Sequence, residues 1–409
     1  MGNRFSSPLL PIFLIVFVDV LGLTIVLPLL PFYTEKYGGS PSVYGLLASS
    51  YALCSLISGP LLGQISDRVG RKPLLILSQV GTFIGFLILG FSTSLWMIFL
   101  SRVIDGATAG NLSLAQAYIS DVTTPQNRAR AFGLIGIAFG LGFPLGTTIS
   151  AFLSKYGYSY PAWAAAFLSF TSIMATTFLL PKKEIHRAQA QVKDEPSKKT
   201  NILHPRKYAK YFKIPVLRSL LFEFFAFSFG FATFISGFAL FAERRFFHNG
   251  HPFQVTEVGY VYAYTGLLGL IIQGGLLGRL VKKFGEKKLI KIGFLSMAVG
   301  YGLLGWTTSI GMLLVVAAMG SFGTGILRPT ITSLVTQNAP RHEQGLILGL
   351  NQSLFSIAQI LAPLLAGFLV GQGMLLGWAL TAGASGAIGL FLSLKRFREP
   401  AATMSENPI

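Results

Sequence analysis

GQISDRVGRK, residues 63–72, lies between two long apolar stretches and has the composition of a short turn that joins two membrane helices. Its glycines allow close helix packing and a tight turn, while its charged residues end one apolar run and anchor the next helix at an interface. These residues are Gly63, Asp67, Arg68, Gly70, Arg71 and Lys72. The stretch recurs as GRLVKKFGEK at 278–287, with both glycines at the same spacing. One hairpin design therefore occurs twice.

The composition excludes a soluble globular protein. Of 409 residues, 52% are hydrophobic and 12% charged, and a mean hydropathy of +0.61 would leave far too much apolar surface exposed in a soluble fold. The first apolar run begins near Pro8, exceeds a signal-peptide core in length and has no small-residue cleavage site after it, which predicts a retained span. The single Cys54 excludes a disulfide framework and a cysteine metal site.

Twelve apolar runs of roughly 20 or more residues predict an all-α polytopic membrane protein with six plus six transmembrane helices. The runs fall near 9–32, 43–64, 73–93, 95–120, 129–154, 160–181, 215–242, 255–281, 288–306, 309–336, 344–370 and 374–395. They predict an N-terminal six-helix bundle at 1–181, a linker at 182–213, a C-terminal bundle at 214–395 and a tail at 396–409. The low apolar content of the linker suits a surface helix or a mobile tether.

Most of the 33 Lys and Arg residues lie in loops on one side of this topology. Short basic loops resist translocation, so we expect this side, with both termini, to face the cytoplasm from a cell (inner) membrane. The opposite side carries Lys36, Lys155, Arg244 and Arg245, and the spans contain Arg102 and Arg328. Because the net charge of +18 is spread over loops rather than over one basic and aromatic face, no nucleic-acid partner is expected.

These motifs resemble those of the major facilitator superfamily, specifically its twelve-helix drug/proton antiporter branch, which includes tetracycline efflux pumps. GQISDRVGRK is similar to the loop signature of the superfamily, VDVLGLTIVLPLLP at 18–31 to the opening helix of the branch, and SRVIDGATAG at 101–110 to its helix 4 signature. The resemblance covers about residues 10–395. It implies two six-helix bundles around a central cavity that opens alternately to each side.

The resemblance also implies a gating network at the cytoplasmic face, which would lock the bundles in one state. Its members would be Gly63, Asp67, Arg68, Gly70, Arg71, Asp121, Arg128 and Arg130. In the second repeat the positions of Asp67 and Arg71 hold Lys282 and Glu286. The network is therefore expected to be inverted in sign or lost there.

Two departures from the family pattern concern the transport path. The helix 5 signature expects a Gly-Pro pair and then a Gly-Gly pair, and this chain has Gly146-Thr147 and Ser150-Ala151. Tetracycline pumps carry ionisable groups in helices 3, 8 and 9, at positions aligned here with Gly85, Gly269 and Met297. The comparison argues against tetracycline itself as the substrate and implies a proton route with fewer groups.

Asp19 is the leading candidate for proton coupling. Charges near the bilayer midplane are costly and are normally retained for transport pathways or paired sites. Asp19 lies about ten residues into the first helix, roughly 15 Å along it, close to mid-membrane. A carboxyl there can hold a proton and release it when a substrate or an opposite charge arrives. The alternative is a structural hydrogen bond to neighbouring backbone or to Arg102.

Three more charged residues are candidates for proton coupling. Arg102 and Asp105 are spaced i, i+3, so their side chains emerge on neighbouring parts of one helix face. Arginine keeps its charge and can control a proton on a nearby carboxyl by moving closer or farther, unless the two form a neutralised pair that only fixes helix packing. Glu223 lies in helix 7, with snorkelling or a pair with Arg218 as its alternatives.

Substrate contact is predicted for aromatic and polar residues within spans. Nine phenylalanines fall between Phe222 and Phe241, with three tyrosines following in helix 8, and such rings bind apolar or amphipathic molecules where they face a cavity. For the amides the alternative is inter-helix hydrogen bonding, and for Arg328 it is a cap on carbonyls opened by Pro329. The predicted contacts are Asn111, Gln116, Phe231, Phe234, Tyr264, Gln273, Arg328, Asn351, Gln352 and Gln359.

Other site chemistries find no support in the sequence. The five histidines lie in loops or at helix ends without metal-ligand spacing, and no phosphate-binding Walker loop is present. We therefore expect no enzyme activity, no cofactor and no ATP hydrolysis. The sequence predicts a proton-coupled exporter of small amphipathic organic compounds, acting as a monomer. A facilitator or symporter for an endogenous metabolite or lipid is the first alternative, and a non-transporting receptor or scaffold is the second.

Overall fold

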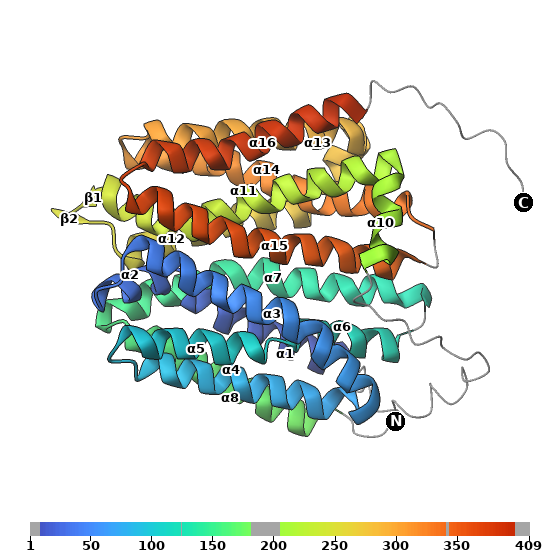
Figure 1. The fold of residues 1–409 in the computed structure, drawn as a ribbon, viewed down its shortest axis with the longest axis horizontal. Helices are drawn as coiled ribbons and strands as arrows, with labels where there is room; N and C mark the ends of the chain where they lie inside the picture. Colours follow the sequence, from blue (N-terminus) through green and yellow to red (C-terminus); the bar gives the residue numbers. More distant parts are fainter. Residues whose placement is uncertain (1–8, 124, 181–204, 341–342, 397–409) are drawn as a thin grey trace, which may run out of the picture. The chain divides into compact units, whose positions relative to one another are not determined.

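The computed structural model describes residues 9–123, 125–180, 205–340 and 343–396, without the side chains of residues 9, 125–132, 205–208 and 345. It confirms an all-α polytopic membrane protein (Figure 1). The helices are α1 (Leu9–Val26), α2 (Leu29–Lys36), α3 (Pro41–Val69), α4 (Arg71–Gly90), α5 (Leu95–Ala107), α6 (Asn111–Val122), α7 (Pro125–Leu153), α8 (Ser159–Leu179), α10 (Pro205–Lys213), α11 (Pro215–Arg245), α12 (Val255–Ile271), α13 (Leu277–Leu303), α14 (Ile310–Gln337), α15 (Gln344–Gly371) and α16 (Leu375–Arg396). The short strands β1 (Phe247–His248) and β2 (His251–Pro252) form a hairpin.

The described residues contain nine helices that are long and apolar enough to span a membrane, or ten if the bent pair of α1 and α2 forms one span. Two differences reduce the predicted twelve spans to ten. The run 95–120 is divided into α5 and α6, and the runs 255–281 and 288–306 form one helical stretch, Val255–Trp306. That stretch contains a π-helical turn at Ile272–Leu276 and a non-helical residue at Gly285.

The break between α5 and α6 is stabilised by a side chain from α4. Ser78 donates a hydrogen bond to the carbonyl oxygen of Thr108 and accepts one of 2.9 Å from the backbone N–H of Gly110. Backbone groups that leave a helix within a membrane need such partners because lipid supplies none. The sequence shows the glycine at the break, but it does not show that Ser78 of another helix satisfies the freed backbone groups. This explains why one continuous helix was predicted.

Both glycines of the repeated hairpin adopt a conformation that other residues avoid. Gly70 has φ 103° and ψ 152°, and Gly285 has φ 73° and ψ 154°. This region of backbone space is essentially restricted to glycine. The tight turn predicted at Gly70 is confirmed, and the second repeat turns in the same way. The close helix packing predicted at Gly63 is not seen among the described residues, none of which has an atom within 4 Å of a Cβ placed there.

Gly70 and Gly63 form a matched pair for mutation. Replacing Gly70 by Ala is expected to lower the free energy of unfolding by about 1–3 kcal/mol, because alanine is strained at this φ and ψ. Gly63→Ala, in the interior of α3 and facing open space, is expected to raise it by up to about 1 kcal/mol. Reversible denaturation of both variants in detergent micelles measures the difference. Equal effects of the two substitutions would contradict the conformational argument.

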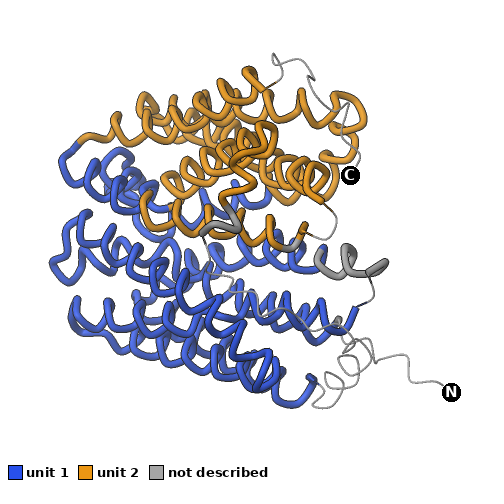
Figure 2. Tube along the Cα trace, turned by 45° about the vertical axis from the view of Figure 1, so that its right-hand side comes forward, with its two compact units in different colours: residues 1–203, 236–267, 363–373 blue, residues 204–235, 268–362, 374–409 orange. Residues whose placement is uncertain are grey.

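Contacts divide the chain into two compact units, coloured separately in Figure 2. Unit 1 comprises residues 1–203, 236–267 and 363–373, and unit 2 comprises residues 204–235, 268–362 and 374–409. Three of the five boundaries fall inside helices, namely α11, α12 and α15. The division at 181 and 214, inferred from the sequence repeat, stays a prediction.

Unit 1 is built on the packing of α1 against α7 and α8, and of α4 against α5 and α8. Its core includes Ile12, Ile15, Leu74, Leu114 and Tyr118. This packing places the middle of α1 beside polar residues of α4 and α8. In unit 2, α13 packs against α14 and α16, and Phe234 of α11 stacks on Tyr301 of α13 with ring centroids 4.7 Å apart.

Within unit 1, glycines bring the ends of α12 and α15 close to α7 and α3. A Cβ at Gly45 of α3 would lie 2.5 Å from the carbonyl oxygen of Pro363 in α15. A Cβ at Gly259 of α12 would lie 2.8 Å from the carbonyl oxygen of Thr147 and from the Cβ of Ala151 in α7. The degenerate helix 5 signature therefore forms a packing surface for a glycine of α12.

The linker contains a surface helix in its last part. Lys210 of α10 forms an ion pair with Glu343, and the Tyr211 hydroxyl donates a hydrogen bond of 2.9 Å to the same carboxylate. Both residues belong to unit 2 together with Glu343, so α10 is tied to the residue that precedes α15. The remainder of the predicted linker and the predicted tail beyond Arg396 lie outside the described residues.

Candidate proton-coupling site

The Asp19 carboxyl in α1 accepts one hydrogen bond from a short polar chain that crosses two other helices. Ser172 of α8 donates to Asp19 Oδ1 at 2.9 Å, and the Ser172 hydroxyl accepts a hydrogen bond of 2.8 Å from Gln79 Nε2 of α4. Ser172 and Gln79 are fully buried. Asp19 Oδ2 is buried and has no hydrogen-bond partner in the described part of the chain. One neutral donor offsets little of the desolvation of a buried carboxylate, so this oxygen is suited to bind a proton.

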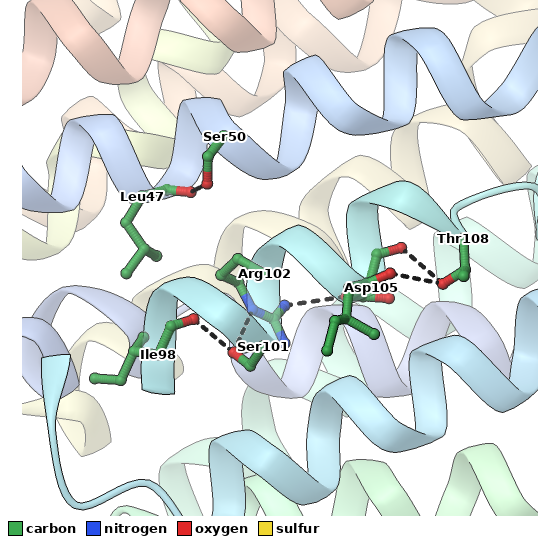
Figure 3. Close-up of polar contacts among 8 residues, drawn as sticks. Leu47, Ser50, Ile98, Ser101, Arg102, Asp105 and Thr108 are labelled. Carbon is green, nitrogen blue, oxygen red and sulfur yellow. Dashed lines mark hydrogen bonds and ion pairs between the residues drawn. The ribbon is translucent and has the colours of Figure 1, made fainter. Parts of the chain in front are cut away.

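Arg102 and Asp105 form the pair predicted from their spacing (Figure 3). Arg102 Nη1 lies 3.1 Å from Asp105 Oδ2, and the exposed fractions of the two residues are 2% and 3%. The guanidinium carbon also lies 5.6 Å from the centroid of the Phe86 ring, and Nε donates a hydrogen bond of 3.3 Å to Ser101. The pair is therefore shielded from water and its charges are weakly screened.

Gly85 of α4 makes the room that Asp105 occupies. A Cβ at this position would lie 3.0 Å from Asp105 Cβ and 3.0 Å from the carbonyl oxygen of Ser101. The resemblance implies an ionisable group at this position of helix 3 in tetracycline pumps. In this chain the position has no side chain, and the neighbouring carboxyl is that of Asp105 in α5.

Asp19 and the Arg102–Asp105 pair share one electrostatic environment. Asp19 interacts with Asp105, and Tyr51 interacts with Asp19, Arg102 and Asp105. With both carboxyls ionised, the two carboxylates and one guanidinium carry a net charge of −1, and a single proton makes the group neutral. We refer to Asp19, Ser172, Gln79, Arg102 and Asp105 as the α1–α4–α5–α8 cluster.

Asp19 and Glu223 contact other residues than the arginines considered as their structural partners in the sequence. The described contacts of Asp19 include Ser172 and no hydrogen bond with Arg102. Glu223 pairs with Arg396 of α16 and not with Arg218: Glu223 Oε2 lies 3.2 Å from Arg396 Nη1, with side-chain exposures of 0% and 5%. Ser219 donates a further hydrogen bond of 3.1 Å to Glu223. Glu223 is thus a member of a separate buried ion pair in unit 2.

At the Gly70 turn, Arg71 joins two carboxylates. Its Nε lies 2.8 Å from Asp121 Oδ2 at the end of α6, and its Nη2 lies 2.6 Å from Asp67. Arg71 Nη1 also donates to the Ser66 hydroxyl at 2.6 Å. Arg68 is exposed and makes no polar contact with the described residues, and the side chains of Arg128 and Arg130 lie outside that part of the structure.

The second repeat has an inverted version of this contact. Glu286, at the position of Arg71, accepts a hydrogen bond of 2.7 Å from Ser333 and bonds of 3.3 and 3.2 Å from Gln337, both near the end of α14. Each repeat therefore links the residue after its turn glycine to a following helix. The first link is ionic, whereas the second joins a carboxylate to neutral donors, so the expectation of a network that is inverted in sign or lost in the second repeat stays a prediction.

Because the Arg71 contact is ionic and the Glu286 contact is not, replacing each residue by Gln is expected to have different effects. Arg71→Gln removes the ion pair with Asp121 and is expected to weaken the link by about 1.5–3 kcal/mol. Glu286→Gln keeps a carbonyl oxygen that accepts from Ser333 and is expected to cost under about 1 kcal/mol. Amide hydrogen exchange at residues 64–70 and 279–285 measures the local opening. The ionic account predicts faster exchange at the first turn only, and equal acceleration at both turns would contradict it.

The predicted substrate residues differ in exposure. The exposed ones are Gln116, Gln273, Arg328, Gln352 and Gln359, the half-buried ones are Asn111, Phe231 and Tyr264, and the buried ones are Phe234 and Asn351. Phe234 packs on Tyr301, and Phe231 stacks on Phe227 with centroids 6.0 Å apart. Gln273 lies in the π-helical turn, a feature that often marks functional sites. Their roles in substrate binding stay predictions.

Sequence reasoning missed an ion pair at the opposite end of unit 1 from Gly70. Arg244, at the end of α11, lies 2.5 Å from Glu35 of α2 and 2.9 Å from Glu243. Burial and the nearby carboxylates of Glu243 and Glu35 raise the pKa of Tyr158. These residues fall in predicted loops, where charges are ordinary, so the sequence carried no signal for their pairing.

The fold is that of an all-α polytopic membrane protein with charged residues inside its spans, and comparison with known proteins supplies the family. A family model described as Major Facilitator Superfamily matches residues 12–277 and 253–408. The chain belongs to the Major Facilitator Superfamily.

Relatives place the chain near drug-resistance proteins, as the resemblance in its motifs predicted. The class B tetracycline resistance protein of Escherichia coli is 30% identical over 355 residues, covering 86% of this chain and 85% of that protein. Multidrug resistance protein 2 of Bacillus subtilis (strain 168) is 26% identical over 355 residues, covering 87% and 86%. The human organic anion transporter MFSD10 (TETRAN) has a similar fold, with a TM-score of 0.68, 23% identity and coverage of 96% and 100%.

Proposed function

We propose that this protein is a proton-coupled exporter of small amphipathic organic compounds that works by alternating access. The observation that carries the proposal is the Asp19 carboxyl, which has one buried oxygen without a hydrogen-bond partner among the described residues and lies in a cluster that one proton neutralises. Relatives named for tetracycline and multidrug resistance support export of organic compounds. The Gly70 turn and both termini face the cytoplasm in this proposal.

Exchange requires that a proton on Asp19 and a bound substrate disfavour each other. Protonation of Asp19 from outside favours return to the inward-facing state, and substrate binding from inside favours proton release and the outward turn. Ser172 orients the carboxyl, with Gln79 holding Ser172, while Arg102 and Asp105 provide a fixed field around it. The proton never needs to reach a second carboxyl in this scheme, which agrees with the glycines and methionine at the other expected positions.

Two ion pairs are suited to gate the cycle. Arg71 with Asp121 would hold the cytoplasmic end, and Arg244 with Glu35 would hold the outer end, where glycines of α3 and α12 bring helices together. Each contact can break and reform as the protein changes state, since each joins side chains on different helices. Their partial exposure keeps the cost of opening moderate.

The proton gradient supplies enough energy for this exchange. One proton crossing about 100 mV releases roughly 2.3 kcal/mol, and each pH unit adds about 1.4 kcal/mol. Since a tenfold gradient costs about 1.4 kcal/mol, one proton per substrate supports accumulation of about a hundredfold or more.

Reconstituted liposomes test the proposal. Labelled lipophilic cations, zwitterions and anions are offered to wild-type protein under an imposed pH gradient, with a pH-sensitive dye inside the vesicles. Export by antiport predicts that at least one compound accumulates against its gradient while the pH gradient collapses, and that an ionophore that equilibrates protons stops the accumulation. Compounds that equilibrate without proton movement would instead support the facilitator for a metabolite or lipid.

A further inference from the structure

Arg328 in unit 2 is a membrane-embedded charge that the α1–α4–α5–α8 cluster does not use. It lies in α14 directly before Pro329, about nine residues from the helix end at Gln337, hence roughly 14 Å along the axis. Its side chain is exposed, and its guanidinium carbon lies 5.3 Å from the ring centroid of Phe355 in α15. Over the described ranges, no carboxylate pairs with it and it donates no hydrogen bond to a backbone carbonyl. The cap at the proline break, one of its expected roles, is not observed.

The exposure of Arg328 at this depth is informative. Arginine stays charged at every physiological pH. Charged residues within membrane spans face the protein interior or a water-filled cavity, because contact with lipid is too costly. An exposed guanidinium in the interior of α14 therefore presents a permanent positive charge to an aqueous space within the membrane.

A second, independent observation comes from Asn351. It lies one helical turn before Phe355 on α15, so both side chains emerge on the same face of the helix. Asn351 is 4% exposed, yet neither Nδ2 nor Oδ1 has a hydrogen-bond partner among the described residues. Buried amides are nearly always paired. An amide with both groups unpaired, next to the ring that holds the guanidinium, marks a place where a polar ligand group binds.

We propose that Arg328, Asn351 and Phe355 form a subsite for the carboxylate of an organic anion that also carries an aromatic or extended apolar part. The guanidinium matches a carboxylate with two parallel hydrogen bonds, and the Asn351 amide adds a further donor. The Phe355 ring lies under the guanidinium carbon and offers apolar surface to the rest of the ligand. The inference rests on the proposed function and names its substrate class.

Binding of a matched pair of probes to the purified protein in detergent tests this subsite. The probes are 2-naphthoate and the neutral 2-naphthamide, which share one ring system, and the measurement is titration calorimetry without a pH gradient. Wild type is expected to bind the naphthoate more tightly than the amide. Arg328→Gln is expected to weaken naphthoate binding by about tenfold or more and to leave the amide unchanged, since charge-assisted hydrogen bonds are lost. Asn351→Asp is expected to abolish naphthoate binding by placing a competing carboxylate near the guanidinium.

Lys283→Gln is the control. Lys283 is also an exposed cation over a phenylalanine ring, 5.4 Å from the centroid of Phe284, but it lies beside the Gly285 turn and should leave both probes unaffected. No naphthoate binding by wild type, or equal binding by wild type and Arg328→Gln, would overturn the subsite. If Arg328→Gln does not fold, Asn351→Asp decides the question alone.

The result is separable from the export proposal. Charge-selective binding that depends on Arg328 would stand even if no compound were accumulated in liposomes. Proton-driven export of at least one compound, together with equal naphthoate binding by wild type and Arg328→Gln, would remove the subsite and leave the exporter.

Discussion

Replacing Asp19 by Asn is expected to abolish proton-driven substrate accumulation. The amide keeps the shape of the carboxyl and an oxygen that accepts from Ser172 Oγ, but it cannot exchange a proton. A gradient of about two pH units supports accumulation of about a hundredfold, and the variant should lose all of it. Exchange of labelled for unlabelled substrate across the same liposomes needs no proton and should persist at saturating substrate, although the amide resembles the protonated carboxyl and should bind substrate more weakly.

Two further variants show whether the loss belongs to Asp19. Ser172→Ala removes the hydrogen bond but keeps the proton carrier, so it should shift the pH at which accumulation is half-maximal without abolishing accumulation. Glu257→Gln, at a carboxyl that accepts from the backbone N–H of Gln254 at the start of α12, should behave as wild type. Full accumulation by Asp19→Asn would show that another group carries the proton.

Removing Arg102 alone is expected to have the largest effect on stability. Arg102→Met leaves Asp105, which is 3% exposed, without its ionic partner, and breaking a buried pair in this way costs about 3–5 kcal/mol. The double variant Arg102→Met, Asp105→Leu removes both charges and should recover most of this loss, because an apolar pair of similar volume avoids the desolvation of both ions. Unfolding free energies of the two single variants and the double variant give the coupling energy directly.

The double variant also separates packing from transport. If the pair only fixes helix packing, the double variant should be stable and should accumulate substrate as well as wild type. We expect it to be stable but to couple protons poorly, because the field that Asp19 experiences has changed. A cost under about 1 kcal/mol for Arg102→Met, with no rescue by the second substitution, would contradict a shielded pair.

The sequence predicts interactions within one helix or turn of this protein better than it predicts which distant residues contact one another. Gly70 and Gly285 are recognisable because a charged turn between two apolar runs needs a residue that tolerates positive φ, and both glycines adopt it. The i, i+3 spacing of Arg102 and Asp105 likewise predicts their pairing, since helix geometry alone brings them together.

Contacts between distant helices are what the sequence could not supply. Glu223 pairs with Arg396 at the far end of the chain, and Asp19 is held by Ser172, an ordinary serine in an apolar run. Neither partner has a local signal, because tertiary packing chooses among many polar side chains of similar depth. The break at Thr108–Gly110 was missed for the same reason, since it depends on Ser78 of another helix.

Proton exchange at Asp19 is tested by counting the protons released when substrate binds. Purified protein in weakly buffered detergent, near the pH at which transport is half-maximal, is mixed with the compound that accumulates in liposomes, and a pH-sensitive dye reports the change. Linkage through Asp19 predicts release of up to one proton per bound molecule by wild type and none by Asp19→Asn, although both bind the compound. Equal release by the two proteins, or binding to wild type without any release, would contradict proton exchange at Asp19.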